Sequence, residues 1–257
     1  MIRALTVSET NSILTAIHAQ RSTHGDFLLD AVPMADQETI LAASVRAPSA
    51  SNRQVYSIIV LEDQAVMKEL LGYQAGLALV FCNDTTRMDD LAQALGTDYP
   101  FNPTSRLMTG IFDVAVAAQN AALAATALGW GTLFTNCLHR GDLRRAWRLL
   151  GLPEKNCLPV ITLLIGRPKH EHPPKSRWHG PGLIHRGRYQ RLNAEEIQTQ
   201  IAAYDQQNQD WQDHPHFLSK FFADAKRGGP AHDPNIIHPI DQILTETGFT
   251  QQPMRKS

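Results

Sequence analysis

The stretch that most constrains the fold is 111–128, which reads IFDVAVAAQNAALAATAL. It holds eight alanines and would present an apolar surface on nearly every side of a helix. A helix without a polar face has to be covered all round, by its own core or by a partner subunit. Gln119, Asn120 and Thr126 interrupt the run, which is shorter than the roughly 20 residues that span a bilayer. We therefore predict a buried core helix that ends at Gly129.

Runs of strand and helix character alternate around this segment. β-branched or apolar runs predict strands over 56–61, 77–82, 131–138 and 158–166. Apolar spacing and end signals predict helices over 8–20, 35–46, 64–72, 88–95, 142–153, 194–205 and 240–248. Ser8 is the expected N-cap of the first helix, Gly72 ends the third, and 97–106, with two prolines, is expected to be a loop. Interleaved strands and helices indicate an α/β or α+β fold.

The character of the chain changes after GRPKHEHPPKSR. We divide it into a main domain, 1–186, and a more polar C-terminal extension, 187–257. Asn193 followed by Glu196 predicts a capping box for the helix that begins at 194. Aromatic residues argue against simple disorder in the extension, namely Trp211, Phe217, Phe221 and Phe222. We expect the extension to pack on the same domain or on a partner subunit.

Composition excludes some classes of protein. The 24 cations and 25 anions give a net charge of -1, which provides no electrostatic footprint for nucleic acid or an anionic membrane. The three cysteines are Cys82, Cys137 and Cys157, and they form no CxxC pair. The first residues lack the apolar region of a secretory signal. We therefore expect a reducing, cytoplasmic environment.

Three polar stretches carry the candidate chemistry: RSTH at 21–24, PSASNRQ at 48–54 and PPKSR at 173–177. If the fold brings the cations of the first and third together, guanidinium and ammonium groups match the oxygens of a phosphate. The short side chains of the second would let a ligand approach the backbone. From residue chemistry alone, solvated surface turns are the alternative interpretation.

Five motifs follow one another along the chain. They are Arg21-Ser22, Ala47-Pro48-Ser49-Ala50-Ser51-Asn52-Arg53-Gln54, a helix with Asp113, Gln119-Asn120 and Leu128-Gly129, the pair Gly151-Leu152-Pro153 and Gly166-Arg167-Pro168, and Lys175-Ser176-Arg177. In this order, over about 7–186, they resemble the FMN-dependent nitroreductase family. The extension resembles that of the larger NADPH-dependent nitroreductases and flavin reductases.

The resemblance implies an α+β fold, with a central, mostly antiparallel sheet flanked by helices in an intertwined homodimer. It implies an FMN oxidoreductase that transfers hydride from NAD(P)H to nitroaromatic, quinone or flavin acceptors by a ping-pong mechanism. Because flavin carries the redox chemistry, the protein binds, orients and tunes the ring. We accordingly expect neither a catalytic triad nor a metal site, and we interpret His170 and His172 as residues of a solvated loop.

The resemblance also assigns roles to individual residues. Those expected to bind the FMN phosphate are Arg21, Ser22, Lys175 and Arg177, with His24 as a weaker, pH-dependent cation. Those expected to line the ribityl chain and ring, often from the other subunit, are Pro48, Ser49, Ala50, Ser51, Asn52 and Gln54. Gln74 is expected to approach the ring, and the segment with Leu133, Phe134, Thr135 and Asn136 to face it with backbone groups.

Two alternatives stay open. The family often continues its Asn-x-Gln motif with Pro-Trp, whereas this chain has Gln54-Val55-Tyr56. That change is compatible with a specialised flavoenzyme, such as a dehalogenase or a ring-substrate dehydrogenase. The other alternative is a flavin-binding or flavin-delivery protein without turnover.

Overall fold

The computed structural model describes residues 11–139, 142, 144–171, 173, 175, 177–208, 214–227 and 239–250. The chain forms two compact units. The described residues of the sheet unit lie within 11–173 and 239–250, and those of the tail unit lie within 175–227. The division at residue 186 that the sequence suggested stays a prediction.

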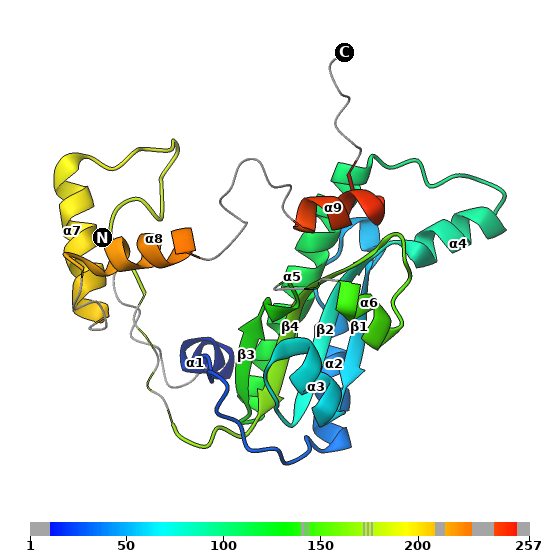
Figure 1. Ribbon diagram of the computed structural model, residues 1–257, viewed down its shortest axis with the longest axis horizontal. Helices are drawn as coiled ribbons and strands as arrows, with labels where there is room; N and C mark the ends of the chain where they lie inside the picture. Colours follow the sequence, from blue (N-terminus) through cyan, green and yellow to red (C-terminus); the bar gives the residue numbers. More distant parts are fainter. Residues whose placement is uncertain are drawn as a thin grey trace. The chain divides into compact units, whose positions relative to one another are not determined.

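A four-stranded antiparallel sheet forms the centre of the sheet unit (Figure 1). Its strands are β1 (Tyr56–Leu61), β2 (Leu77–Asp84), β3 (Gly131–Thr135) and β4 (Cys157–Gly166). Their order is β1-β2-β4-β3, so β1 and β3 form the two edges. The register pairs Tyr56 with Asn83, Leu77 with Ile165, and Gly131 with Gly166. The predicted third strand is shorter than expected, because a 3₁₀ turn, Cys137–His139, follows it.

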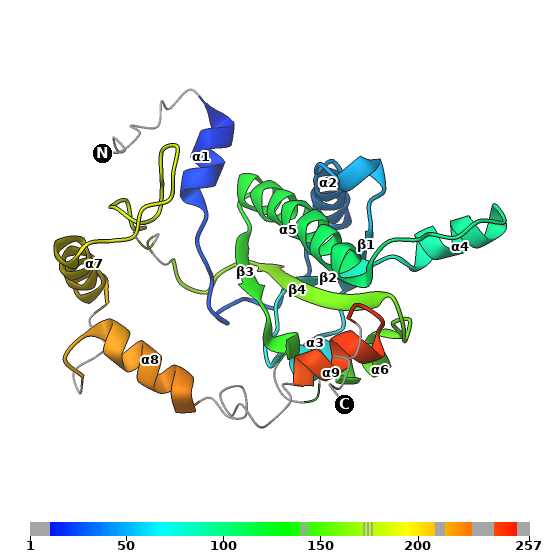
Figure 2. The same ribbon diagram turned by 90° about the horizontal axis from the view of Figure 1, so that it is seen from above.

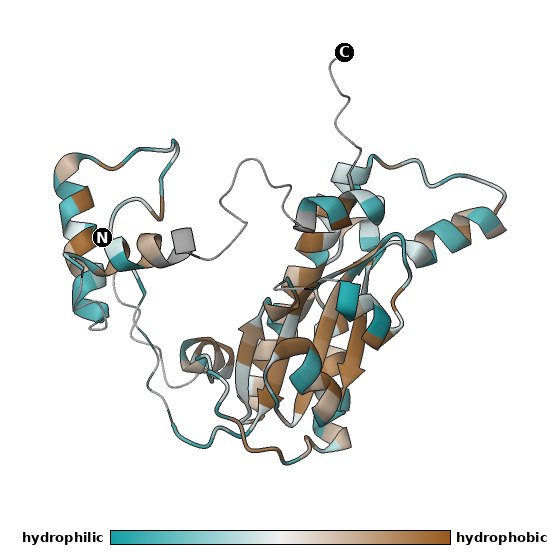
Figure 3. Cartoon of the chain, viewed as in Figure 1, coloured by the Kyte–Doolittle hydropathy of each residue, from teal (hydrophilic) through white to brown (hydrophobic). Residues whose placement is uncertain are grey.

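Both faces of the sheet are covered, which explains why its central strands are continuously apolar. Side chains alternate along β2: Leu77, Leu79 and Phe81 join the core on one face, whereas Ala78, Val80 and Cys82 join the core on the other. Figure 2 shows α2 (Met34–Val45) and α5 (Pro103–Ala127) on the first side, with α3 (Gln64–Leu71) and α6 (Arg144–Leu150) on the second. The strands are the most hydrophobic part of this unit (Figure 3).

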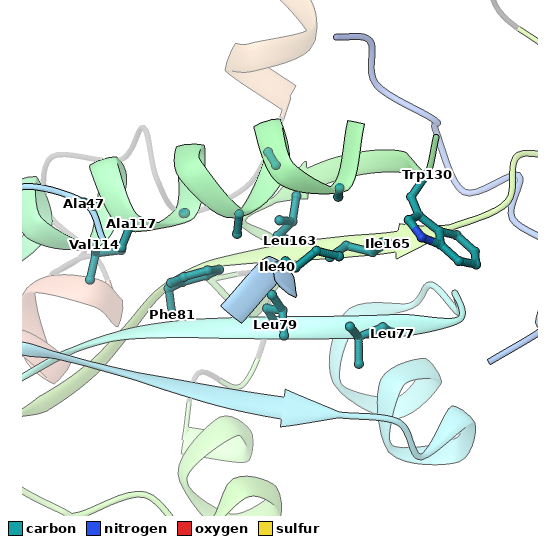
Figure 4. Close-up of a cluster of buried hydrophobic side chains, with 14 of the residues drawn as sticks. Ile40, Ala47, Leu77, Leu79, Phe81, Val114, Ala117, Trp130, Leu163 and Ile165 are labelled. Atoms are coloured by element: carbon teal, nitrogen blue, oxygen red, sulfur yellow. The ribbon is translucent and has the colours of Figure 1, made fainter. Parts of the chain in front are cut away.

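Helix α5 is the predicted core helix, and small side chains allow it to pack closely on the sheet. Ala117, Ala121 and Ala125 are fully buried in the core that also holds Leu79 and Phe81 (Figure 4). By length and composition α5 is the one helix among the described residues that could cross a membrane. Its burial against the strands makes it a core helix instead.

The start of α5 corrects the predicted loop at 97–106. Asn102 is the N-cap and accepts hydrogen bonds from the amides of Thr104 and Ser105, at 2.9 and 3.3 Å. Pro103 occupies the first turn, where its missing N–H costs nothing. At Gly110 a Cβ would lie 1.9 Å from Asn83 Oδ1, so only glycine lets the helix approach β2 here.

The remaining helix boundaries follow local signals. Helix α1 (Ser12–Ala19) has Asn11 as its N-cap, while the predicted cap, Ser8, lies outside the described residues. Helix α3 ends at Gly72, with φ of 72°, as predicted. Helix α4 (Thr86–Ala94) begins two residues before its predicted start.

The tail unit contains α7 (Ala194–Gln207) and α8 (Phe217–Arg227). The capping box of Asn193 and Glu196 is confirmed. Helix α8 was not predicted. It meets α7 through Phe217, whose ring lies 6.4 Å from that of Tyr204 and whose amide donates to Asp205 Oδ1 at 2.8 Å. The last helix, α9 (Pro239–Glu246), belongs to the sheet unit, where Ile243 packs with Leu158.

Candidate functional site

The segment 47–54, which we call the cradle, connects α2 to β1 in a strained conformation. Ser51, Asn52 and Gln54 have φ values of 52°, 55° and 47°. Left-handed backbone at a residue other than glycine costs on the order of 1 kcal/mol, and it persists only where the surroundings impose it. The partners of the cradle therefore show what the fold is built to hold.

Asp113, on α5, is the main anchor of the cradle. Its fully buried carboxylate accepts hydrogen bonds from Ser49 Oγ at 2.6 Å and from the Ala50 amide at 3.0 Å. Ser49 Oγ in turn accepts from the Gln54 amide at 2.7 Å. The hydroxyl of Ser49 thus donates one hydrogen bond and accepts another, and both stabilise the conformation of the loop. The buried carboxylate is satisfied by these donors without a cation.

Two further contacts fix the end of the cradle. Arg87 Nη2 donates to the carbonyl oxygen of Arg53 at 3.2 Å and also to that of Gln54. Gln54 Nε2 donates to Asn52 Oδ1 at 2.6 Å. Ser51 and Asn52 remain exposed at the rim, together with Pro48. Hydrogen bonds therefore fix the conformation of the cradle, and the small polar residues Ser51 and Asn52 are exposed on its surface.

Tyr56 lies just beyond the cradle, with its side chain in the core. Burial raises the pKa of its phenol, the negative charge of Asp113 raises it further, and Arg87 partly opposes both effects. Its buried hydroxyl has no hydrogen-bond partner among the described residues. Tyr56 therefore stays neutral and contributes packing.

At the other edge of the sheet, the segment with Arg21 and Ser22 runs alongside β3. Ser22 forms a parallel bridge with Thr132, and the Thr23 amide donates to the Thr132 carbonyl oxygen at 2.8 Å. His24 is exposed in the turn that follows. Two predicted site elements, far apart in the sequence, are thereby brought together.

Arg21 lines a cavity of about 520 Å³ in which sequence reasoning missed a second cation, Arg167. The guanidinium carbon of Arg167 lies 5.1 Å from the ring centroid of Trp130, which orients it. Thr126 and Thr132 line the same cavity, as does one carboxylate, that of Glu171. Two guanidinium groups with nearby hydroxyls suit a phosphate. In the sequence, Arg167 was marked only by its position after a buried strand and by its place in the Gly166-Arg167-Pro168 motif, neither of which indicated a role in binding.

The predicted ring-facing segment lies on β3 and just after it. Leu133 and Thr135 are buried, whereas Phe134 and Asn136 are exposed. Because β3 is an edge strand, its outer backbone groups beyond Thr132 have no neighbouring strand among the described residues. This edge can offer backbone groups to a flat ligand.

Gln74 lies between α3 and β2 with its side chain half-buried. Its Nε2 donates to the Gln64 carbonyl oxygen at 3.1 Å, which leaves the amide oxygen as the group that can meet a ligand.

Lys175 and Arg177 belong to the tail unit and are exposed there. Arg177 Nη1 donates to the Lys175 carbonyl oxygen at 2.9 Å. Their convergence with Arg21 stays a prediction.

Comparison with known proteins decides the family. The nitroreductase family matches residues 18–167. The chain belongs to the nitroreductase family. Among its relatives, the NADPH-flavin oxidoreductase of Vibrio harveyi is 31% identical over 206 residues, which cover 76% of this chain and 80% of the relative. The FMN reductase [NAD(P)H] of Bacillus subtilis is 30% identical over 208 residues, covering 77% and 81%.

The fold agrees with that membership. The solved structure of NfrA2 from B. megaterium matches with a TM-score of 0.81 at 24% identity, covering 93% of this chain and 98% of the other. The antiparallel sheet with helices on both faces is therefore the nitroreductase fold, and the α+β prediction is confirmed.

Proposed function

We propose that this nitroreductase is an FMN-dependent oxidoreductase that transfers hydride from NAD(P)H to nitroaromatic, quinone or flavin acceptors. The observation that carries the proposal is the cavity beside β3, which Arg21 and Arg167 line together with Thr126 and Thr132. Family membership and the NAD(P)H-dependent relatives support the donor and the cofactor.

The residues present fit FMN. Arg21, Ser22 and Arg167 would hold the phosphate, joined by Lys175 and Arg177, with His24 as a weaker contributor. The edge of β3 from Leu133 to Asn136 would meet the ring with backbone groups, and Gln74 would contribute its amide oxygen. When bound, FMN supplies the two-electron redox chemistry. The chain would bind the cofactor, orient it and leave it accessible to both substrates.

Donor and acceptor would bind next to the cofactor in turn. NAD(P)H loses a hydride and leaves as NAD(P)⁺ before the acceptor enters. A quinone then gains the hydride equivalent and one proton to become a hydroquinone. The exposed, short side chains at the rim of the cradle, such as Ser51, impose few steric limits, which favours broad acceptor tolerance.

A homodimer completes the site. The cradle precedes β1, whereas the Arg21 segment lines β3, so the two lie at opposite edges of the sheet. Three strand spacings separate those edges by roughly 14 Å. The cradle would therefore serve the cofactor of a second subunit. Exposed apolar side chains on α5, at positions three and four apart, offer an interface: Met108, Ile111 and Phe112.

Two further proposals concern the setting of the enzyme. The C-terminal extension, 187–257, packs on its own domain or on the partner subunit. The protein works in the cytoplasm, a location that its three free cysteines suit.

Loss of cofactor affinity tests the proposal. Arg21→Ala should weaken FMN binding by about 1.5–3 kcal/mol, because a charged hydrogen-bond partner of the phosphate is removed. Quenching of FMN fluorescence on titration with apoprotein measures the dissociation constant. Arg46→Ala is the matched control, since Arg46 is an exposed cation at the end of α2. Equal affinity in both variants would place the phosphate elsewhere. Initial rates with NADPH and a quinone should give the parallel lines of a ping-pong mechanism.

A further inference from the structure

Arg53 is a cation inside the cradle, and no carboxylate among the described residues neutralises its charge. Its side chain is half-buried, and it has no carboxylate partner among the described residues. Its Nε donates to the Ala50 carbonyl oxygen at 3.1 Å, and Nη1 donates to Tyr99 Oη at 2.5 Å. Nη2 has no hydrogen-bond partner in the part of the chain that the structure describes.

The segment 95–102, which we call the aromatic loop, holds this guanidinium in place. The guanidinium carbon of Arg53 lies 4.7 Å from the ring centroid of Phe101. The rings of Tyr99 and Phe101 are themselves in contact, with centroids 4.7 Å apart and planes tilted by 51°. Stacking and hydrogen bonding together restrict the rotation of Arg53 and orient its remaining donors.

The neighbouring Arg106 shows what a purely structural arginine looks like here. Its guanidinium carbon lies 4.6 Å from the Tyr99 ring centroid, and it forms an ion pair with Asp89 at 3.0 Å. Arg106 therefore has both an aromatic contact and a counter-charge. Arg53 has aromatic contacts and two hydrogen bonds, but no counter-charge among the described residues. The half-buried guanidinium of Arg53 therefore keeps donors and a charge that an anion can use.

The surroundings of Arg53 also limit what that anion can be. The cavity that Arg53 lines with Tyr99 and Phe101 has a volume of about 10 Å³, which is room for one water. A substrate cannot enter this cavity and has to bind at the exposed surface beside Arg53. Phe101 is 47% exposed, so its ring can pack against another ring. One planar guanidinium matches a carboxylate, since its fork offers two parallel donors and a single charge.

We infer that Arg53 makes aromatic carboxylates the preferred acceptors of this enzyme. The inference rests on the proposed function, because Arg53 belongs to the cradle that would border the flavin. The acceptor's carboxylate meets the free donors of Arg53, and its ring lies beside Phe101. Arg53 is thus a specificity-determining residue that acts on substrate binding.

Two isosteric acceptors test this directly. 4-Nitrobenzoate and 4-nitrobenzamide share shape and nitro group and differ in charge. For the native holoenzyme with NADPH, we expect kcat/KM to be about tenfold higher for the benzoate, the equivalent of about 1.4 kcal/mol. Most of the difference should appear in KM, because the contact is formed on binding.

Variants then assign the preference to Arg53. In Arg53→Leu the benzoate-to-benzamide ratio should fall to about one, and Arg53→Lys should restore part of it because the charge remains. Arg46→Leu removes an exposed cation outside the cradle and should leave the ratio as in the native protein. A ratio that stays high in Arg53→Leu, or that is near one in the native enzyme, would overturn the inference.

A binding measurement covers the case in which Arg53→Leu distorts the cradle. Calorimetric titration of the native holoenzyme with benzoate and with benzamide should show about tenfold tighter binding of benzoate. Equal binding of the two would also overturn the inference. Failure of the proposed function is distinct, because the protein would then not reduce either nitro compound with NADPH or NADH.

Discussion

The sheet unit and the tail unit depend on different interactions. In the sheet unit, two buried clusters lie on opposite faces of one sheet, and residues such as Phe81 and Leu163 are fully buried. In the tail unit, none of the described side chains is buried, and its two helices meet through Tyr204, Phe217 and the pair Asp205–His216. Regions with few buried apolar contacts open most readily. The sheet unit should therefore carry the global stability, and the tail unit should respond to local changes.

The largest expected contrast is between two phenylalanines. Phe81→Ala, in the buried sheet, should lower the free energy of unfolding by about 3–5 kcal/mol, because it leaves a cavity. Phe221→Ala, in the tail unit, removes a side chain that is 56% exposed and should lower it by about 0.5 kcal/mol or less. Urea unfolding followed by circular dichroism measures both. Similar losses in the two variants would show that the tail unit shares the core.

Asp113, the anchor of the cradle, should give the next largest loss of stability. Asp113→Ala should lower the free energy of unfolding by about 2–3 kcal/mol, because Ser49 Oγ and the Ala50 amide lose their buried acceptor. The strained cradle should then relax, and FMN retention should fall with it. Asp113→Asn keeps the shape and one acceptor oxygen, so it should lose less. An alanine variant that matches the native protein in both stability and FMN content would remove the anchoring role.

A variant of the capping box tests the local stability of the tail unit. Asn193→Ala should destabilise α7 by about 1 kcal/mol, since the Glu196 amide loses its partner. Hydrogen exchange of the α7 amides should quicken, while β2 and β4 keep their protection. Equal acceleration in the strands would mean that the two units open together.

A smaller effect should appear in acid. The hydrogen bond from His216 holds the pKa of Asp205 below its ordinary value, with help from the Phe217 amide. A carboxyl whose pKa is lowered on folding stabilises the fold above its unfolded pKa, and this contribution is lost as the pH falls through the lowered value. The contact between α7 and α8 should thus loosen below about pH 4. The amide resonance of Phe217 reports it, and Asp205→Asn should abolish the pH dependence. A Phe217 signal that does not move with pH in the native protein would contradict the assignment.

Thiol reactivity gives the smallest contrast. The hydrogen bond from Cys157, together with burial, raises the pKa of Cys82, so its thiolate is absent at neutral pH. Cys137 is partly exposed. Native protein should label at Cys137 alone, and denatured protein at all three cysteines. Mass spectrometry of labelled peptides distinguishes these sites, and rapid labelling of Cys82 in native protein would contradict the buried sheet.

Local signals predicted much of the fold, whereas long-range contacts could not be read from the sequence. Apolar runs placed β1 correctly, and Gly72 marked the end of α3, because both signals act within a few residues. Helix α5 starts earlier than predicted, because Pro103 favours a helix start as well as a loop. The bond between Ser49 and Asp113 joins residues 64 positions apart, and no local pattern indicates it. Arg167 was missed for the same reason, since its cavity is completed by Arg21 and Trp130.

The most direct test of the central claim is anaerobic addition of NADPH to the purified holoprotein. If the Arg21 side of the sheet holds FMN in reach of a hydride donor, the visible flavin absorbance should bleach on stoichiometric addition and return when a quinone is supplied. A yellow holoprotein whose absorbance is unchanged by both NADPH and NADH would contradict the account.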